Sequence, residues 1–564
     1  MNTHHLDPKV VAPLNRRQFL QLSGSMATMV ALGLTAGDNT SAQVLSTLKD
    51  YPFALGIASG DPLPDGIVLW TRLAPKPLEP DGGLPPGQSV PVSWEVASDE
   101  AMTRVVQKGT ALASSALAYS VHVEVQGLQA GHEYFYRFRA GTYVSPVGRT
   151  RTAPAPGTHV NKLAFAFASC QSWPSGFYSA YRRMAEENLD FVVFLGDYIY
   201  EGGIDSHGGI RGVPIPDQFR ESTQTLERYR LQHALYKTDP DLQKAHALFP
   251  WIVTWDDHDV VNDYAGGPPY IDPASTKYKS ERLFKRRAAA YQAFYEHLPL
   301  RSTSIPRGPD MLLYRRLGWG DLAEFSVLDT RQYRSQPPCG PGEKARCAAA
   351  FDPALTMTGP DQERWLLEGL SRSHARWNVI AQQVLMAQFD LSYGNGTKFW
   401  QDSWDGYPAA RNRILSYLAA RHIANPVVIS GDWHSSFVND LKMDFANPRS
   451  ATVASEFLCT SISSFGNEEV YGPYYGPYIP HNPHIKFFDG DRRGYIRCVL
   501  DHDKWVSDFR MVTTVGRPDA PIYTLASFAV ESNKPGAQLN AIYEQPVEKG
   551  TVDLLPGGVT HPTT

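Results

Sequence analysis

Five apolar segments of the sequence end in side chains that suit metal ions or phosphate. The endings are Ser169-Cys170-Gln171, Gly196-Asp197-Tyr198, Asp256-Asp257-His258-Asp259, Asp329-Thr330-Arg331 and Gly431-Asp432-Trp433-His434. One such ending would be unremarkable, because aspartate often opens a loop or caps a helix. Five endings of this kind in one region predict a shared metal site instead of five separate structural uses.

The residue types at these endings bear on which ions the site would hold. Asp197, Asp257 and Asp432 are hard carboxylate ligands that suit Ca²⁺, Mg²⁺ or Mn²⁺. The thiol of Cys170 prefers a softer ion, and the phenol of Tyr200 favours trivalent iron. We therefore predict that Asp197 bridges two ions and that Tyr200 binds iron, although Tyr200 taken alone could simply line the core.

Three further side chains could take part in binding or in proton transfer. His258 lies between two aspartates and could be a ligand, or a general acid for a leaving oxygen with a pKa set by those carboxylates. His434 follows Asp432 by two residues, so both can face one side of an extended segment. Arg331, with Arg334 nearby, is a planar cation suited to phosphate, although a single arginine is more often a solvated surface charge.

The elements that would position these residues form an alternating pattern from about residue 160 onward. Strands are predicted at Lys162–Cys170, Leu189–Asp197, Trp251–Asp259, Ala323–Arg331, Trp377–Met386 and Asn425–His434, helices at Phe177–Asn188, Ser280–Glu296 and Gly359–Ser371, and a β-hairpin at Gly494–Val515. This pattern favours an α/β fold with a sheet covered on both faces by helices. Ligands of such sheets bind outside the carboxyl ends of the strands, which would bring the five endings together.

The N-terminal third differs in texture from the rest of the chain. Residues 50–152 contain short Val-, Tyr-, Phe- and Trp-rich runs separated by turn residues, which predicts an all-β, fibronectin III-like sandwich packed on the next domain. A Pro- and Gly-containing linker, Arg149–Asn161, leads into the second domain, residues 160–515. Residues 516–564 are assigned to a C-terminal tail.

Residues 1–42 have the layout of an export signal. Arg16 and Arg17 precede an apolar stretch, Met26–Leu34, and small residues allow cleavage after Ala42. The arginine pair resembles a twin-arginine signal, whereas a general secretory signal is the alternative. We expect a periplasmic or secreted protein that meets the twin-arginine export machinery, and no other apolar run approaches the roughly 20 residues of a membrane span.

Composition and cysteine count add two constraints. The 564 residues carry a net charge of −5, which gives no electrostatic signal for nucleic-acid binding. Of the five cysteines, Cys339 and Cys347 bracket a loop that a disulfide could close, and Cys459 and Cys498 could pair or be buried thiols. Cys170 remains and calls for a chemical role.

Together the motifs resemble the PhoD-like (alkaline phosphatase D) branch of the calcineurin-like metallophosphatases. They are FASCQ (167–171), GDYIYEG (196–202), WDDHDVVND (255–263), LDTRQYR (328–334) and SGDWH (430–434). The resemblance implies a four-layer core of two facing sheets flanked by helices, preceded by a β-sandwich. It also implies hydrolysis of phosphomonoesters and phosphodiesters with Fe³⁺ and Ca²⁺.

Carried over motif by motif, the resemblance also implies roles for single residues. The iron ligands would be Cys170, Asp197, Tyr200 and His434, and the calcium side would be formed by Asp197, Asp257, Asn262 and Asp432. The thiol in the first motif, where many superfamily members have Asp-x-His, fits the PhoD branch and argues against a di-zinc or di-manganese enzyme. A metal-bound hydroxide would attack phosphorus in line, His258 would help the alcohol leave, and Arg331 would hold a non-bridging oxygen.

Other interpretations compete with this one. In a thiol hydrolase, Cys170 would be the nucleophile, with His258 or His434 as its base. In a non-enzymatic exported binding protein, the carboxylates would hold structural calcium. Within the phosphatase interpretation, the substrate could be a monoester, a diester, a phospholipid or a teichoic-acid-like polymer, because the pocket walls come from long loops that the sequence does not place.

Overall fold

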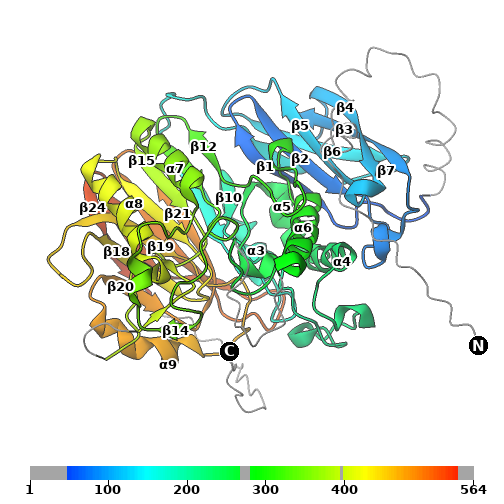
Figure 1. The fold of residues 1–564 in the computed structure, drawn as a ribbon. Helices are drawn as coiled ribbons and strands as arrows, with labels where there is room; N and C mark the ends of the chain where they lie inside the picture. Colours follow the sequence, from blue (N-terminus) through cyan, green and yellow to red (C-terminus); the bar gives the residue numbers. More distant parts are fainter. Residues whose placement is uncertain (1–47, 267–279, 394–397, 544–564) are drawn as a thin grey trace, which may run out of the picture.

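A computed structural model describes residues 48–266, 280–393 and 398–543 (Figure 1). The predicted signal at residues 1–42 lies outside the described residues, so the export prediction stays a prediction. In the described ranges, no helix combines the length and the apolar character needed to cross a membrane.

The largest sheet contains ten strands and runs through most of the molecule. In spatial order it consists of β24 (Lys534–Ile542), β23 (Ile522–Glu531), β22 (Lys504–Val512), β21 (Arg493–Leu500), β9 (Leu163–Ala168), β10 (Phe191–Phe194), β11 (Pro250–Val253), β1 (Ile57–Leu63), β2 (Gly66–Arg72) and β5 (Ser120–Gln126). Its centre is parallel, because β10 pairs in parallel with both β9 and β11. These three strands therefore end on the same edge of the sheet.

A second sheet of seven strands contains the other parallel strands. Its order is β12 (Arg315–Trp319), β13 (Ala323–Val327), β15 (Trp377–Ala381), β17 (Pro426–Ser430), β19 (Thr452–Leu458), β18 (Ser436–Lys442) and β20 (Ile485–Asp489). The six predicted strands are thus confirmed. They are divided between two sheets, so the single sheet favoured by the alternating pattern taken alone was wrong, whereas the resemblance had implied two sheets. A continuous apolar strand shows that both faces are covered without showing whether a helix or another sheet covers them.

Helices account for the remaining covered faces. The described α-helices are α3 (Ser179–Met184), α4 (Leu226–Lys237), α5 (Pro240–Leu248), α6 (Ser280–His297), α7 (Pro360–Arg372), α8 (Pro408–Ala420) and α9 (Tyr471–Tyr475). Proline opens α5, α7 and α8, where its missing N–H costs nothing because no intrahelical bond would use it. The three predicted helices correspond to α3, α6 and α7.

Three apolar clusters show how the layers meet. One cluster lies between the two sheets, where Phe165 of β9 packs edge-on against Phe325 of β13 at 5.2 Å between ring centroids. A second cluster joins the other face of the ten-stranded sheet to α3, α4, α5 and α6. The third joins the seven-stranded sheet to α7 and α8. The green α3–α6 helices and the α7–α8 pair lie in different parts of the view in Figure 1.

The N-terminal strands are continuous with the large sheet. A five-stranded sheet holds β4 (Val105–Ser114), β3 (Ser89–Ala97), β6 (Glu133–Ala140), β7 (Tyr143–Val144) and β8 (Gly148–Arg151). It shares an apolar cluster with β1, β2 and β5, and β1 pairs in parallel with β11, Ser59 opposite Pro250. Backbone hydrogen bonds between β1 and β11 therefore join the N-terminal β region to the region that follows it.

The C-terminal segment also differs from its sequence assignment. Residues 516–564 were assigned to a tail, yet β23 and β24 within this range extend the ten-stranded sheet. The many Gly and Pro residues around these strands obscured a strand pattern that is visible in Ile522–Glu531, whose burial is nearly continuous.

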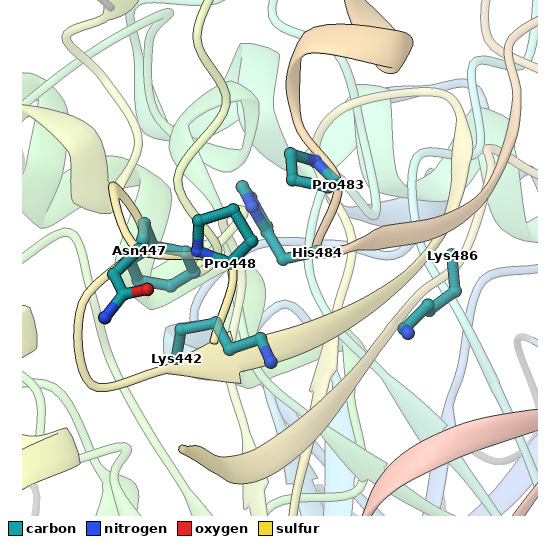
Figure 2. A pocket seen from close by; sticks show the side chains of 7 residues that line it. Lys442, Asn447, Pro448, Pro483, His484 and Lys486 are labelled. Carbon is teal, nitrogen blue, oxygen red and sulfur yellow. The ribbon is translucent and has the colours of Figure 1, made fainter. Parts of the chain in front are cut away.

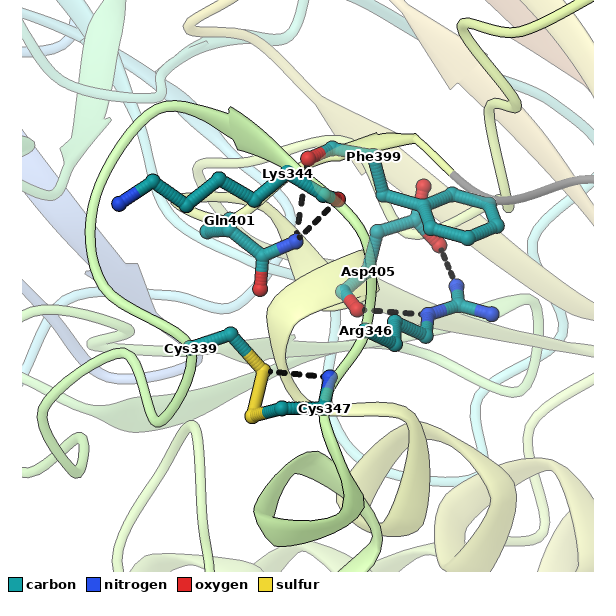
Figure 3. The surroundings of a disulfide bond; sticks show 7 residues. All are labelled: Cys339, Lys344, Arg346, Cys347, Phe399, Gln401 and Asp405. Atoms are coloured by element: carbon teal, nitrogen blue, oxygen red, sulfur yellow. Dashed lines mark hydrogen bonds and ion pairs between the residues drawn. A yellow bond between two sulfur atoms is a disulfide. The ribbon is translucent and has the colours of Figure 1, made fainter.

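The cysteines divide into one disulfide and three thiols. Cys339 and Cys347 form the disulfide that the sequence suggested, and Cys459 and Cys498 are separate buried thiols, as is Cys170. Figure 3 shows that the closed loop lies beside Phe399, whose ring packs under the Arg346 guanidinium at 3.7 Å. Gln401 Nε2 donates to the carbonyls of Lys344 and Phe399 at 3.0 and 3.1 Å.

Candidate metal centre

The carboxyl ends of the parallel strands of both sheets meet at one place. Gln383, after β15, donates to Thr254 Oγ1 after β11 at 2.9 Å, and Thr254 in turn donates to the Leu328 carbonyl after β13 at 3.0 Å. Glycine is required at two positions where segments of the chain come closest to each other. A Cβ at Gly196 would lie 2.4 Å from Asp256 atoms, and one at Gly431 would lie 2.5 Å from Ser169 Oγ.

Four of the predicted ligands have unusual backbone conformations. The φ angles of Cys170, Asp197, Asp432 and His434 are 60°, 55°, 66° and 53°. Residues with side chains rarely adopt positive φ, and such strain persists only where surrounding structure enforces it, as at functional sites. The sharp turn directly after each strand directs these side chains to a common point.

Cys170, Asp197, Tyr200 and His434 lie together, although they come from three separate stretches of the chain. The donor atoms of Cys170, Asp197 and His434 all lie within 4.8 Å of one another. The Tyr200 hydroxyl is 2.9 Å from His434 Nε2 and accepts a hydrogen bond from Ser464 Oγ at 2.7 Å. A thiol, a carboxylate, an imidazole and a phenol are thereby available to one ion.

An acidic cluster adjoins this group. The donor atoms of Asp256, Asp257 and Asp432 lie within 4.8 Å of one another, as do those of Asp257, Asp263 and Asp402, and those of Asp197, Asp257 and His258. Asp197 belongs both to this cluster and to the group with the thiol. Asn262 is exposed, and its backbone N–H donates to Glu201 Oε1 at 3.0 Å.

Arg331 lies inside the acidic cluster and is fully buried. Its guanidinium contacts Asp256, Asp402 at 2.6 Å, Asp432 at 3.1 Å and Asp257 at 3.5 Å. The alternative of a solvated surface charge is therefore wrong for this residue. The neighbouring Arg334 is equally buried and pairs with Asp402, so the two cations offset part of the negative charge gathered here.

His258 is held by a partner that sequence analysis did not single out. Its Nδ1 lies 2.7 Å from Glu201 Oε2, and its ring packs against Tyr200 at 4.4 Å between centroids. Burial alone would lower the pKa of His258, but Glu201, Asp257 and Asp197 outweigh that effect and raise it well above 6.5. The imidazole therefore carries a proton that it can donate.

Burial and crowding act strongly on the candidate ligands. Burial, reinforced by neighbouring carboxylates, raises the pKa of Asp197 and of Asp432 well above 3.8. Burial and Asp197 likewise raise the pKa of the Cys170 thiol. Burial, helped by Arg493 and His258, lowers the pKa of His434 to about 3, which leaves a neutral ring, the form that binds metals.

These features fit a site for cations. The buried oxygen Asp256 Oδ2 has no hydrogen-bond partner in the described part of the chain, and buried carboxylates in contact repel one another unless positive charge lies between them. The donor set combines soft, phenolic and hard ligands, which suits two kinds of ion.

Four acids at the site had no individual role in the sequence prediction. Asp256 and Asp263 stood within a quoted motif, and Glu201 stood within another, but none was given a role. Asp402 lies after β16 (Phe399–Trp400), in a stretch without any motif. For Glu201 the position three residues after a strand-end motif was an available signal, whereas only the fold brings Asp402 to Arg331.

A small pocket elsewhere on the second sheet is separate from this site. The pocket has a volume of about 70 Å³, and Figure 2 shows Lys442, His484 and Lys486 among the residues that line it. Strand β18 starts beside His434 and ends at Lys442, so at about 3.3 Å per residue the pocket lies roughly 20 Å from the metal-ligand candidates. It is not part of the candidate metal centre.

Comparison with known proteins agrees with this geometry. A family described as PhoD-like phosphatase matches residues 165–509, and the N-terminal domain of PhoD-like phosphatases matches residues 34–154. The chain belongs to the PhoD-like phosphatase family. It is 45% identical over 525 residues to alkaline phosphatase D of Bacillus subtilis (strain 168), covering 93% of this chain and 88% of that protein.

The similarity to PhoD extends to the three-dimensional structure. A solved structure titled "Structure of PhoD" superposes with a TM-score of 0.82 at 45% identity, covering 88% of this chain and 93% of the other. The chain is accordingly a PhoD-like phosphoric ester hydrolase with a mixed α/β fold.

Proposed function

We propose that this PhoD-like phosphatase is an exported, metal-dependent enzyme that hydrolyses phosphomonoesters and phosphodiesters. The observation that carries the proposal is the meeting of Cys170, Tyr200 and His434 around Asp197, which also belongs to the acidic cluster. A thiol and a phenol beside carboxylates suit Fe³⁺ next to Ca²⁺ better than two identical ions.

The proposed ligands divide between two sides of Asp197. Cys170, Tyr200 and His434 would hold iron together with Asp197, whereas Asp197, Asp257, Asp432 and Asn262 would hold calcium. When bound, these ions would neutralise phosphoryl oxygens and lower the pKa of water so that hydroxide is the nucleophile. Burial and, after it, neighbouring carboxylates raise the pKa of Asp197 and of Asp432, and bound cations would favour the ionised form of both.

His258 is proposed as the general acid of the reaction. The Nδ1 atom of His258 is hydrogen-bonded to Glu201, so Nε2 is the nitrogen that remains available to give a proton to the departing alkoxide. Glu201 also accepts the backbone N–H of Asn262, which ties the carboxylate to the loop after His258. Glu201 therefore orients the ring and keeps its proton in place.

Arg331 is proposed to hold a non-bridging phosphoryl oxygen. Its contacts with Asp257 and Asp432, through Nη2, are the two longest of its four, at 3.5 and 3.1 Å. Nη2 is thus the nitrogen whose N–H groups are the most available to a phosphoryl oxygen, while the shorter contacts with Asp256 and Asp402 keep the guanidinium plane in place.

The finer features of fold and location belong to the same proposal. The two sheets with helices on their outer faces correspond to the four-layer metallophosphatase core, and the N-terminal β region corresponds to a fibronectin III-like sandwich. Export by the twin-arginine route would place the enzyme in the periplasm or outside the cell. The substrate includes phosphomonoesters and phosphodiesters, and a polymeric or lipid phosphodiester is the alternative.

Two competing functions receive less support. A thiol hydrolase needs a reactive thiolate, whereas burial and Asp197 raise the pKa of Cys170 and so keep it protonated at neutral pH in the absence of a metal. A calcium-stabilised binding protein would have no use for the thiol and phenol, and the family relationship is to phosphatases.

The test combines element analysis, absorption and activity of the purified full-length protein. We expect stoichiometric iron and calcium, a visible absorption band from tyrosinate on ferric iron, and loss of metal and turnover together in Asp197→Ala. The exposed Asp217→Ala serves as the matched control. The absence of a transition ion, or full activity of D197A against p-nitrophenyl phosphate, would disprove the proposal, and a monoester–diester panel would define the substrate class.

A further inference from the structure

A second group of metal-binding side chains lies far from the catalytic residues. His159, Asp321 and His502 place one donor atom each within 4.8 Å of one another. His159 Nδ1 is 3.1 Å from Asp321 Oδ2, and His502 Nε2 is 3.3 Å from Asp321 Oδ1. The two imidazole rings stack at 4.6 Å between centroids. None of these residues has a part in the phosphatase site.

The group lies at the opposite end of the strands from the candidate metal centre. His159 precedes β9 and Asp321 precedes β13, and His502 occupies the turn between β21 and β22. Leu500 of β21 pairs with Leu163 of β9, which brings that turn to the start of β9. The catalytic residues follow the other end of β9, so at about 3.3 Å per residue the two groups are roughly 25 Å apart.

The three side chains are anchored by their own backbone surroundings. Asp321 Oδ1 accepts the Val160 N–H at 3.0 Å, and the Asp321 N–H donates to the Thr158 carbonyl at 2.9 Å. Arg376 donates its backbone N–H to Asp321 at 2.9 Å and its side-chain Nε to the His502 carbonyl at 2.7 Å. Such outer contacts orient metal ligands and strengthen binding.

One nitrogen of the group lacks a hydrogen bond. His502 Nε2 is buried and makes none within the described ranges, although it lies close to the Asp321 carboxylate. The side chains of His159, Asp321 and His502 are 65%, 29% and 29% exposed, so water can complete a coordination shell. Asp501 and Asp503 flank His502 in the turn and add negative charge that favours a cation.

We propose that His159, Asp321 and His502 form a separate zinc site. Two imidazoles and one carboxylate are the donors that zinc takes in open sites, with water in the fourth position. Tetrahedral bonds of about 2.0–2.1 Å place ligand atoms about 3.3 Å apart, close to the two His–Asp separations found here. The two ring nitrogens lie within 4.8 Å of each other, a separation that side-chain rotation can bring to this value.

Zinc at this site would connect three parts of the fold. His159 belongs to the linker after the N-terminal β region, Asp321 to the seven-stranded sheet and His502 to the ten-stranded sheet. The ion would therefore stabilise the folded chain without touching the reaction, because an ion that binds only the native state raises the unfolding temperature.

The experiment dialyses the full-length holoprotein against micromolar ZnCl₂ and compares wild type, His159→Gln, His502→Gln and the control His132→Gln. Wild type and H132Q should each retain one zinc ion per chain more than H159Q and H502Q. The dissociation constant for this zinc ion should be at least tenfold lower in wild type and H132Q than in H159Q and H502Q. Zinc should raise the unfolding temperature of wild type and H132Q only. Phosphate ester hydrolysis without added zinc should be the same in all four proteins.

The amount of zinc taken up at the candidate metal centre would be the same in the four proteins, so it does not affect the difference in zinc content between them. Equal zinc content and an equal temperature shift in all four would overturn the proposal, as would the absence of any zinc in wild type beyond that of H159Q. H502Q changes the tip of a hairpin and provides the same comparison if H159Q does not fold.

Discussion

The hydrogen bond between Glu201 and His258 allows a quantitative test of the proposed general acid. Glu201→Gln keeps the size of the side chain and removes the charge that holds His258 Nδ1 at 2.7 Å. A buried hydrogen bond to a charged group contributes about 1.5–3 kcal/mol. If this energy orients the protonated ring in the transition state, kcat falls about 10- to 150-fold, because about 1.4 kcal/mol corresponds to a factor of ten.

The assay compares two leaving groups with each variant. The loss in E201Q should be large for an alkyl phosphate, whose alkoxide needs a proton in order to leave, and small for p-nitrophenyl phosphate, whose phenolate does not. Metal content should be unchanged. Glu187→Gln is the matched control, since the Glu187 side chain is 10% exposed and pairs with Arg497 and Arg510 away from the site. The kcat of E187Q should equal that of wild type.

A double-mutant cycle decides whether the effect passes through His258. His258→Asn removes the proton donor, and E201Q should then reduce kcat by less than about threefold more, because coupled residues do not act additively. An E201Q enzyme with full metal content and a kcat within twofold of wild type on the alkyl phosphate would refute the reasoning. Full additivity of the two losses would refute it equally.

Three further predictions concern stability. Asp402→Asn leaves buried Arg331 without one of its shortest partners and should lower the unfolding free energy by about 3–5 kcal/mol in urea titrations; a loss below 1 kcal/mol would contradict the role of this pair. Burial lowers the pKa of Lys237 from 10.5 to about 7, so the folded chain releases this proton before the unfolded chain does, and wild-type stability should rise between pH 7 and 10 by up to about 1.4 kcal/mol per pH unit. This contribution should vanish in Lys237→Met, and equal pH slopes for the two proteins would exclude it. Replacing Cys339 and Cys347 with serine should cost about 2–3 kcal/mol by the loop-entropy relation, and equal melting temperatures of oxidised wild type and the double variant would show that the loop closes without the disulfide.

Much of the site was accessible from the sequence because strand ends are local features. An apolar run followed by Asp or Cys can be read residue by residue, and the carboxyl ends of parallel strands share one edge whatever the loops do. For that reason Cys170, Asp197, Asp432 and His434 could be named as a group before any coordinates. The glycines at 196 and 431 were visible too, although the close approach that requires them was not.

The partners of those residues depended on the folded chain. Glu201 gains its role from a loop that brings His258 to it, and Asp402 reaches Arg331 across 71 positions of sequence. The residue type of Arg331 does not reveal whether it is a surface charge or a fully buried cation among four acids. No local pattern distinguishes these cases, because burial is a property of everything packed around a residue.

The sequence by itself determined which segments are buried strands and which chemical groups stand at their ends, since apolar periodicity and residue type are carried by the chain locally. The tertiary structure decided that the strands divide into two sheets, that the N-terminal strands and β23 and β24 extend one of them, and that four carboxylates surround the guanidinium of Arg331. Pairing between strands that are distant in the sequence depends on long-range packing. This packing determines which surface covers each apolar face and which charged side chains are buried together.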